Sequence, residues 1–389
     1  MCFDGAHVID VQRLRTRFPT LEHKAYLNSG SYGLLAIEVQ QAFERYLADR
    51  LACGADWGGW VQRYEDVRDR LATLLGASPD EVAVTASASA GMNALASALD
   101  FTGERNKIVV SNFEFPTSGQ IWHAQERAGA RVEHVAENED GFIPLEAFEQ
   151  AIDERTRLVA ITHVCYRNGA RLDVAEIVRM ARRKGALVLL DCFQSIGAMQ
   201  VDVRALGVDF AVGGMLKYLL GTAGIGFLYV RQDHIAGLTP RASGWFAQAD
   251  VDAMEGARND PSPTARRFQA GTPPVPNCYA ALAGLDIILE LGPREIERQV
   301  SELTGRCMDR LLEAGCRLAT PRDDARRGPT VAICATDAVE LTNRLAGRNV
   351  IASNRDGNLR AMFHVYNDDS DVDALIEGLL ANRSLLQRA

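Results

Sequence analysis

Three polar residues near the middle of the chain have the types and positions that catalysis requires. Asp191 ends the apolar run LVLLD, which predicts a buried strand, so its carboxylate is expected at the edge of a sheet. Gln194 follows three residues later, and Lys217 follows 26 residues after Asp191, between the apolar run DFAVGG and a glycine-rich turn. Taken singly, such an aspartate most often caps a helix and such a lysine most often lies on the surface. Together, they offer a carboxylate, an amide and an amine at one sheet edge.

This combination matches what pyridoxal phosphate (PLP) needs from a protein. PLP withdraws electrons best when its pyridine nitrogen is protonated, and a carboxylate such as that of Asp191 holds that proton. A lysine in a partly desolvated site has a lowered pKa and can act as nucleophile and base. Gln194 can donate to the phenolate oxygen. The sequence therefore predicts PLP bound as a Schiff base on Lys217, with Lys217 and Asp191 as the catalytic residues.

A candidate phosphate site precedes these residues in the segment TASASAGMN (85–93). It predicts a strand followed by small residues that open a helix, and a helix N-terminus favours an anion. The Ser89 hydroxyl can add a hydrogen bond, although small residues at such a junction often serve packing alone. The chain has no GxxxxGK[ST] or GxGxxG motif, so the sequence gives no support for a nucleoside triphosphate or a dinucleotide.

The elements that must position these residues alternate between strand-like and helix-like runs. This alternation predicts an α/β fold with βαβ units and a mostly parallel sheet, in which ligands bind at the carboxyl ends of the strands. We expect an N-terminal arm (1–25), a large PLP-binding domain (26–275), and a long helix followed by a small α+β domain (276–389). The predicted strands are 81–87, 106–112, 131–135, 156–164, 186–194, 209–214 and 224–231 in the large domain, and 316–321, 330–335 and 359–366 in the small one.

Charge and composition restrict the classes of molecule that the chain is expected to bind. The chain has 389 residues and a net charge of −9, which argues against nucleic acid or an anionic membrane as a partner. We see no apolar run long enough to span a bilayer and no signal peptide, and we expect a cytoplasmic enzyme of amino-acid metabolism. The eight cysteines are scattered without metal-like spacing, so no metal site is predicted.

The chain resembles the class V aminotransferase group of fold-type I PLP enzymes, which includes cysteine desulfurases, isopenicillin N epimerase-like proteins and kynureninases. The likeness rests on YLNSGSYG (26–33), the DxxQ-then-lysine pattern, RFQAGTPP, and LRAMFHVYN (359–367). It implies that Phe115 stacks on the pyridine ring and that the backbone of Ala88 and Ser89 holds the phosphate. It also implies a homodimer in which Thr272 reaches the partner's cofactor, and an Arg360 that clamps the substrate α-carboxylate. The plainer alternatives are a core aromatic for Phe115 and a solvated charge for Arg360.

The sequence departs from this group near the lysine. Leu216 and Gly214 stand where many relatives have histidine and a phosphate-binding serine, so we expect Trp245 or Tyr218 to complete the phosphate site. The segment HVCYRNG offers Tyr166 or Asn168 near the ring. The YLNSGSYG segment supplies the candidate substrate contacts Asn28, Ser29 and Tyr32.

The reaction is predicted mainly from a missing thiol. Cysteine desulfurases carry a cysteine on a loop that corresponds to VIASNRDGN, and this chain has none there. We therefore expect a lyase that cleaves a side-chain bond of an L-amino acid by C–S β-elimination, through an external aldimine and a quinonoid. The alternatives are an aminotransferase or epimerase, a kynureninase-like C–C hydrolase suggested by GWFAQADVDAM, and a non-catalytic PLP-fold binding protein.

Overall fold

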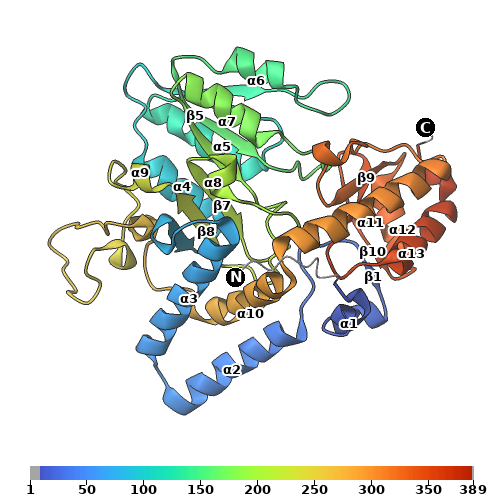
Figure 1. Cartoon of the computed structure of the whole chain (residues 1–389), viewed down its shortest axis with the longest axis horizontal. Helices are drawn as coiled ribbons and strands as arrows, with labels where there is room; N and C mark the ends of the chain where they lie inside the picture. The colour runs from blue at the N-terminus through green and yellow to red at the C-terminus, as the bar shows by residue number, and fades with distance from the viewer. Residues whose placement is uncertain (1–8, 388–389) are drawn as a thin grey trace.

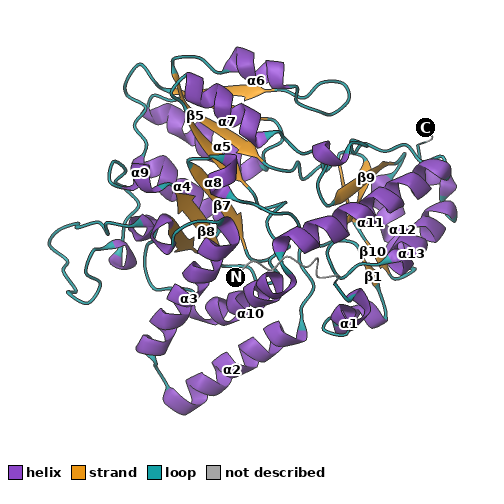
Figure 2. Cartoon of the chain, in the orientation of Figure 1, coloured by secondary structure: helices purple, strands orange, loops and turns teal. Residues whose placement is uncertain are grey.

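The computed structural model describes residues 9–387, and a seven-stranded sheet forms its centre (Figures 1 and 2). The strand order is β2-β8-β7-β6-β5-β3-β4. All neighbouring pairs from β7 to β4 are parallel, whereas β8 runs antiparallel to both β2 and β7. The sheet confirms the predicted α/β fold class, and its strands are β2 (Val82–Thr85), β3 (Lys107–Ser111), β4 (Arg131–Val135), β5 (Thr156–Thr162), β6 (Leu187–Asp191), β7 (Phe210–Gly214) and β8 (Gly226–Val230).

Helices cover both faces of this sheet because successive strand residues point to opposite sides. Ile108 and Val110 of β3 pack with α4 (Ala88–Ala98) and α5 (Pro116–Ala124). Val109 joins the larger core on the other face. The helices of that core include α3 (Trp57–Leu75), α7 (Val174–Arg183) and α10 (Val275–Leu291); smaller or outer helices are α2 (Ile37–Cys53), α6 (Leu145–Ala151), α8 (Val203–Leu206) and α9 (Gln232–Ile235).

A second, smaller sheet lies in the C-terminal part, as predicted. Its strands are antiparallel in the order β11-β12-β9, and the surrounding elements are α11 (Pro293–Glu313), β9 (Thr330–Cys334), α12 (Ala338–Ala346), β10 (Val350–Ile351), β11 (Ser353–Arg355), β12 (Asn358–Met362) and α13 (Asp369–Leu380). The N-terminal segment packs here too: β1 (Ala25–Tyr26) pairs with β10, and α1 (Val11–Arg15) is tied by an ion pair between Arg15 and Asp371 at 2.7 Å (Figure 1).

Two sequence predictions about elements are wrong. The single long helix breaks at Gly292, whose φ is 80°, and the following Pro293 lacks an amide hydrogen, so α10 and α11 are bent by 78°. The predicted strand 316–321 forms isolated bridges instead of a strand, one of them between Leu318 and Ile333. The proposed domain boundaries stay a prediction, and residues 1–8 of the arm lie outside the described residues.

Within residues 9–387 no single helix is long and apolar enough to cross a membrane. The bent pair α10–α11 meets the length and composition criteria only when both helices are counted together.

Candidate active site

A cavity of about 260 Å³ lies where several parallel strands end. Its lining includes Thr162 at the end of β5, Asp191 at the end of β6 and Gly214 at the end of β7. The cavity brings together six of the predicted site residues, namely Lys217, Asp191, Gln194, Ala88, Ser89 and Phe115. Thus the sheet edge gathers side chains that are up to 129 positions apart in sequence (88 to 217).

Lys217 is a buried amine in this cavity. Burial lowers its pKa to about 8; the Asp191 carboxylate opposes this shift and the Arg360 guanidinium adds to it. Its Nζ lies 4.2 Å from the ring centroid of Phe193 and 6.0 Å from that of Phe115. A substantial neutral fraction near pH 8 gives this lysine the lone pair that attack on an aldehyde requires.

Asp191 shares a buried environment with a second carboxyl group. Burial raises the pKa of Asp191, while the N–H of Phe193, which donates to its Oδ1 at 2.8 Å, and the charge of Lys217 favour the ionised form. Glu114 has a pKa raised to about 8 by burial and then by Asp191. Because two neighbouring buried carboxylates repel each other, Asp191 is the one stabilised as an anion and Glu114 is the one expected to keep a proton near neutral pH.

The loop 26–33 packs closely over Lys217. The Gln194 amide donates to the Gly30 carbonyl at 3.1 Å, and the Gly33 N–H donates to the Leu216 carbonyl at 2.8 Å. A Cβ at Gly33 would overlap the Lys217 carbonyl oxygen, so only glycine permits this approach. The Gln194 Oε1 is buried without a hydrogen-bond partner among the described residues.

Arg360 is a buried guanidinium without a carboxylate partner among residues 9–387. It lies on β12, is 5% exposed, and donates to the Tyr166 carbonyl and, at 2.9 Å, to Ser353 Oγ. Its Nε has no partner in the described part of the chain. Burial, followed by the nearby Arg355, lowers its pKa. A buried cation with a free donor is costly unless an anion pairs with it, which fits the predicted carboxylate clamp.

The start of α4 forms the predicted anion site. Ser87 precedes the helix, and its hydroxyl accepts from the Ala90 N–H at 3.0 Å. Within the described structure, the N–H groups of Ala88 and Ser89 make no hydrogen bond, and both residues line the cavity. Free N–H groups at a helix N-terminus suit a phosphate.

Two predicted cofactor contacts do not line this cavity. Asn168 is buried in a turn, where its Nδ2 donates to the Gly141 carbonyl at 2.7 Å and its Oδ1 accepts from the Ala170 N–H at 3.0 Å. The fold therefore uses both ends of this amide, and Tyr166, the alternative from the same segment, lines the cavity instead. Trp245 directs its indole N–H to a carbonyl of its own loop at 2.7 Å, so it does not complete the phosphate site within one chain.

The predicted substrate contacts from the N-terminal loop lie beside the cavity. Ser29 Oγ is buried and bonds the Tyr366 hydroxyl at 2.6 Å. Tyr32 is 43% exposed, and its hydroxyl accepts from the Ala223 N–H at 3.2 Å. Asn28 Oδ1 is buried with no partner among the described residues. Their substrate roles stay predictions, because none of the three lines the cavity.

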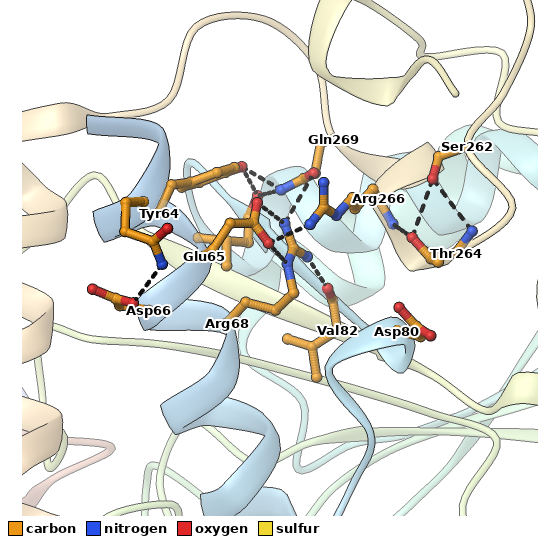
Figure 3. A network of polar contacts seen from close by, with 12 residues as sticks. Tyr64, Glu65, Asp66, Arg68, Asp80, Val82, Ser262, Thr264, Arg266 and Gln269 are labelled. Atoms are coloured by element: carbon orange, nitrogen blue, oxygen red, sulfur yellow. Dashed lines mark hydrogen bonds and ion pairs between the residues drawn. The ribbon is translucent and has the colours of Figure 1, made fainter. Parts of the chain in front are cut away.

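Thr272 lies on an exposed segment that a buried polar network holds in place. Gln269 donates to the Tyr64 hydroxyl, and Arg68 donates to the Val82 carbonyl (Figure 3). Figure 3 shows this network joining α3, the start of β2 and the segment that leads to Thr272. Thr272 is exposed and does not line the cavity of its own chain.

Sequence reasoning missed two residues of the site. Phe193 lines the cavity beside Lys217, and Glu114 lies next to Asp191. The signals were present, because Phe193 lies inside the DxxQ motif and Glu114 directly precedes Phe115. Both follow strand ends, where neighbouring strands place them in one site.

These features fit PLP. The cavity has an amine, a buried carboxyl group, free N–H groups for a phosphate, and the Gln194 amide, whose Oε1 has no partner in the described structure. Arg360, whose Nε is also unpartnered among these residues, is not one of the residues that line the cavity. The aminotransferase class-V family model matches residues 56–375. The chain therefore belongs to the aminotransferase class-V family and is a PLP-dependent enzyme.

Individual relatives cover nearly the whole chain. An uncharacterized aminotransferase, YcbU, of Bacillus subtilis (strain 168) is 34% identical over 370 residues, which cover 95% of this chain and 97% of that protein. A kynureninase of Pseudomonas fluorescens is 30% identical over 362 residues, which cover 88% of this chain and 85% of that protein. The apo structure of a cysteine desulfurase from Thermococcus onnurineus NA1 superposes with a TM-score of 0.86 at 25% identity, covering 96% and 98% of the two chains. These relatives share a fold and family but not one reaction.

Proposed function

We propose that this PLP-dependent enzyme is a lyase that cleaves the C–S bond of a cysteine conjugate by β-elimination. The observation that supports this proposal is the chemistry of the cavity wall. Its titratable side chains are Lys217, Asp191 and Tyr166, and none of the described lining residues is a cysteine. A desulfurase needs a thiol to accept sulfur, whereas β-elimination needs a base at the α-carbon and a leaving group on the β-carbon.

Each residue has a defined part in this proposal. Arg360 binds the substrate carboxylate and thereby orients the α-hydrogen. PLP, when bound, supplies the electron sink for the α-carbon. Asp191 stabilises the positive charge on the pyridine nitrogen, and Lys217 Nζ holds the cofactor and later removes the α-proton. The thiolate then leaves with the electrons of the C–S bond, and hydrolysis yields pyruvate and ammonia.

Two alternatives have support from the comparisons. Transamination or epimerisation of an amino-acid-like metabolite is favoured by the 34% identity to a protein described as an uncharacterized aminotransferase. Kynureninase-like C–C hydrolysis is favoured by the 30% identity to a kynureninase. Both would use the same Lys217, Asp191 and Arg360, so only product analysis separates them.

The test is product analysis with one enzyme preparation on a cysteine S-conjugate, on kynurenine, and on an amino donor paired with a 2-oxo acid. We expect cysteine S-conjugates to give equal amounts of pyruvate and free thiol, measured by lactate dehydrogenase coupling and a thiol reagent. Lys217→Ala should abolish both products and the visible absorbance of the bound cofactor, whereas Lys24→Ala, at an exposed lysine, should change neither. Anthranilate from kynurenine, or amino transfer to a 2-oxo acid without pyruvate and thiol from any conjugate, would refute the lyase proposal.

We also propose that the chain works as a homodimer, with Thr272 reaching the partner's cofactor. Thr272 is exposed and away from its own cavity, Phe115 is 48% exposed, and α2 carries the exposed apolar residues Leu47 and Leu51. Light scattering should give twice the chain mass, and Thr272→Ala should weaken PLP binding without altering the dimer; a monomer that binds PLP fully would contradict this.

The seven cysteines within residues 9–387 are free, which supports a reducing compartment such as the cytoplasm.

A further inference from the structure

The ring of Phe193 and the missing side chain at Gly214 fit each other. Gly214 ends β7, and a Cβ built on it would lie 2.6 Å from Cζ and 3.0 Å from Cε2 of Phe193. Real Cβ contacts are not this short, so any side chain at position 214 would have to move the ring. Both residues line the cavity that holds Lys217.

The backbone of Phe193 cannot move freely to relieve such a clash. Its N–H donates to Asp191 Oδ1 at 2.8 Å, and Cys192, the residue before it, is buried with its N–H bonded to the Val212 carbonyl at 3.0 Å. The ring itself is partly buried and packs against the core formed with α4 and α5. A side chain at Gly214 would therefore displace the phenyl ring by side-chain rotation, within a cavity where it already lies 4.2 Å from Lys217 Nζ.

An aromatic ring beside Lys217 has a clear use in a PLP site. Contact with an aromatic side chain stabilises the binding of a flat, electron-poor pyridine ring. Phe115 supplies one such side chain, with its ring centroid 6.0 Å from Lys217 Nζ. Phe193 supplies a second, and its position depends on the space above Gly214. The ring also excludes water around the amine, in keeping with the lowered pKa of Lys217.

We propose that Phe193 and Gly214 act as a matched pair that positions the cofactor. The phenyl ring forms an aromatic wall that contacts the cofactor, and the glycine leaves free the space that this ring occupies. Phe193 is thus a cofactor-contacting residue and Gly214 a positioning residue that acts through it. This inference rests on the proposed attachment of PLP to Lys217.

The test is a double-mutant cycle of Gly214→Ala and Phe193→Ala, read as PLP affinity from titration of the apoenzyme by visible absorbance and circular dichroism. We expect Gly214→Ala to weaken PLP binding at least tenfold, and Phe193→Ala to weaken it several-fold through loss of the aromatic contact. The double variant should bind no more weakly than Phe193→Ala alone, because the ring that clashes is gone. Independent losses that multiply in the double variant, or an unchanged affinity in Gly214→Ala, would overturn the proposal.

A matched control separates this pairing from general damage to β7. A Cβ at the neighbouring Gly213 would lie 2.7 Å from the ring of Phe227, in the core rather than the cavity. Gly213→Ala should lower the thermal unfolding midpoint of the apoenzyme, and Phe193→Ala should not rescue it. If Gly214→Ala alone fails to fold, recovery of folding and PLP binding in the double variant still supports the pair, and no recovery refutes it.

Failure of the underlying assignment gives a different result. Borohydride reduction followed by peptide mass spectrometry should place the pyridoxyl group on Lys217 in the wild-type enzyme. A label on another lysine would refute the proposed cofactor site itself. A label on Lys217 without coupling between the two substitutions would refute only the Phe193–Gly214 pair.

Discussion

Replacement of Arg360 by methionine should separate substrate binding from folding. In the wild-type chain this buried guanidinium has no carboxylate partner among the described residues, so the apoprotein bears the cost of an uncompensated charge. Removing that charge while filling its volume should leave the apoprotein equally stable or more stable, because buried ions are often no better than apolar residues of similar size. In the complex, the same change leaves the substrate carboxylate buried without a partner. Such a loss costs about 2–5 kcal/mol, or roughly a 30- to 4,000-fold weaker complex.

The assay compares amino-acid substrates with their decarboxylated analogues. Spectral titration of the bound cofactor should show that the wild-type enzyme prefers a cysteine S-conjugate over the matching cysteamine conjugate, and that Arg360→Met removes most of this preference. Arg355→Met is the matched control, because Arg355 lies on the same β11–β12 hairpin but is exposed. An Arg360→Met enzyme that keeps the preference for the carboxylate would show that Arg360 does not bind it. An apoprotein that unfolds at a much lower temperature would show that the arginine serves the fold.

Three further predictions concern Lys217, the loop that packs over it, and the polar network of Figure 3. The rate of PLP incorporation into the apoenzyme, measured by stopped flow, should rise with pH through about 8, where Lys217 becomes neutral. The midpoint should move down in Asp191→Asn and up in Arg360→Met, because Asp191 raises the pKa of Lys217 and Arg360 lowers it. Gly33→Ala should cost about 1–3 kcal/mol of stability through overlap with the Lys217 carbonyl, measured by denaturant unfolding, and a neutral result would mean that the loop can yield. Arg68→Ala should destabilise the chain by about 3–5 kcal/mol, because it removes a buried, hydrogen-bonded charge, whereas a change under about 1 kcal/mol would show that the network of Figure 3 is replaceable.

The sequence was most informative where a strand ends in a polar residue. Apolar runs predicted the strands that carry Asp191 and lead to Lys217, and the parallel order of the sheet then brought both into one cavity. It was least informative about turns, because the use of a side chain there depends on neighbours distant in sequence. The segment HVCYRNG predicts Tyr166 or Asn168 near the ring, yet the Asn168 amide donates to the carbonyl of Gly141, 27 positions earlier.

The single helix predicted after residue 275 is two helices in the structure, α10 and α11. Its apolar periodicity continues across LGPRE, so the pattern favours one helix, whereas Gly292 with a left-handed φ and the following proline end α10 and start α11. Periodicity reports which side of a segment is buried; it does not report the angle at which two buried segments meet. In the structure α10 packs against α2 and α3, whereas α11 packs against α13 and β9.

The residues next to Lys217 are held by parts of the chain that come from opposite ends of the sequence. The Leu216 carbonyl accepts from Gly33, and the Tyr218 carbonyl accepts from the His364 ring at 2.8 Å. The His364 Nδ1 in turn accepts from the Val365 N–H, and burial lowers the pKa of His364 to about 4, so this imidazole stays a neutral donor across the physiological range. The backbone on both sides of the reacting lysine is therefore held by Gly33 and His364, which lie 183 and 146 positions from their hydrogen-bond partners. PLP binding should therefore stabilise the contacts between these distant segments as well as the strand ends that surround it.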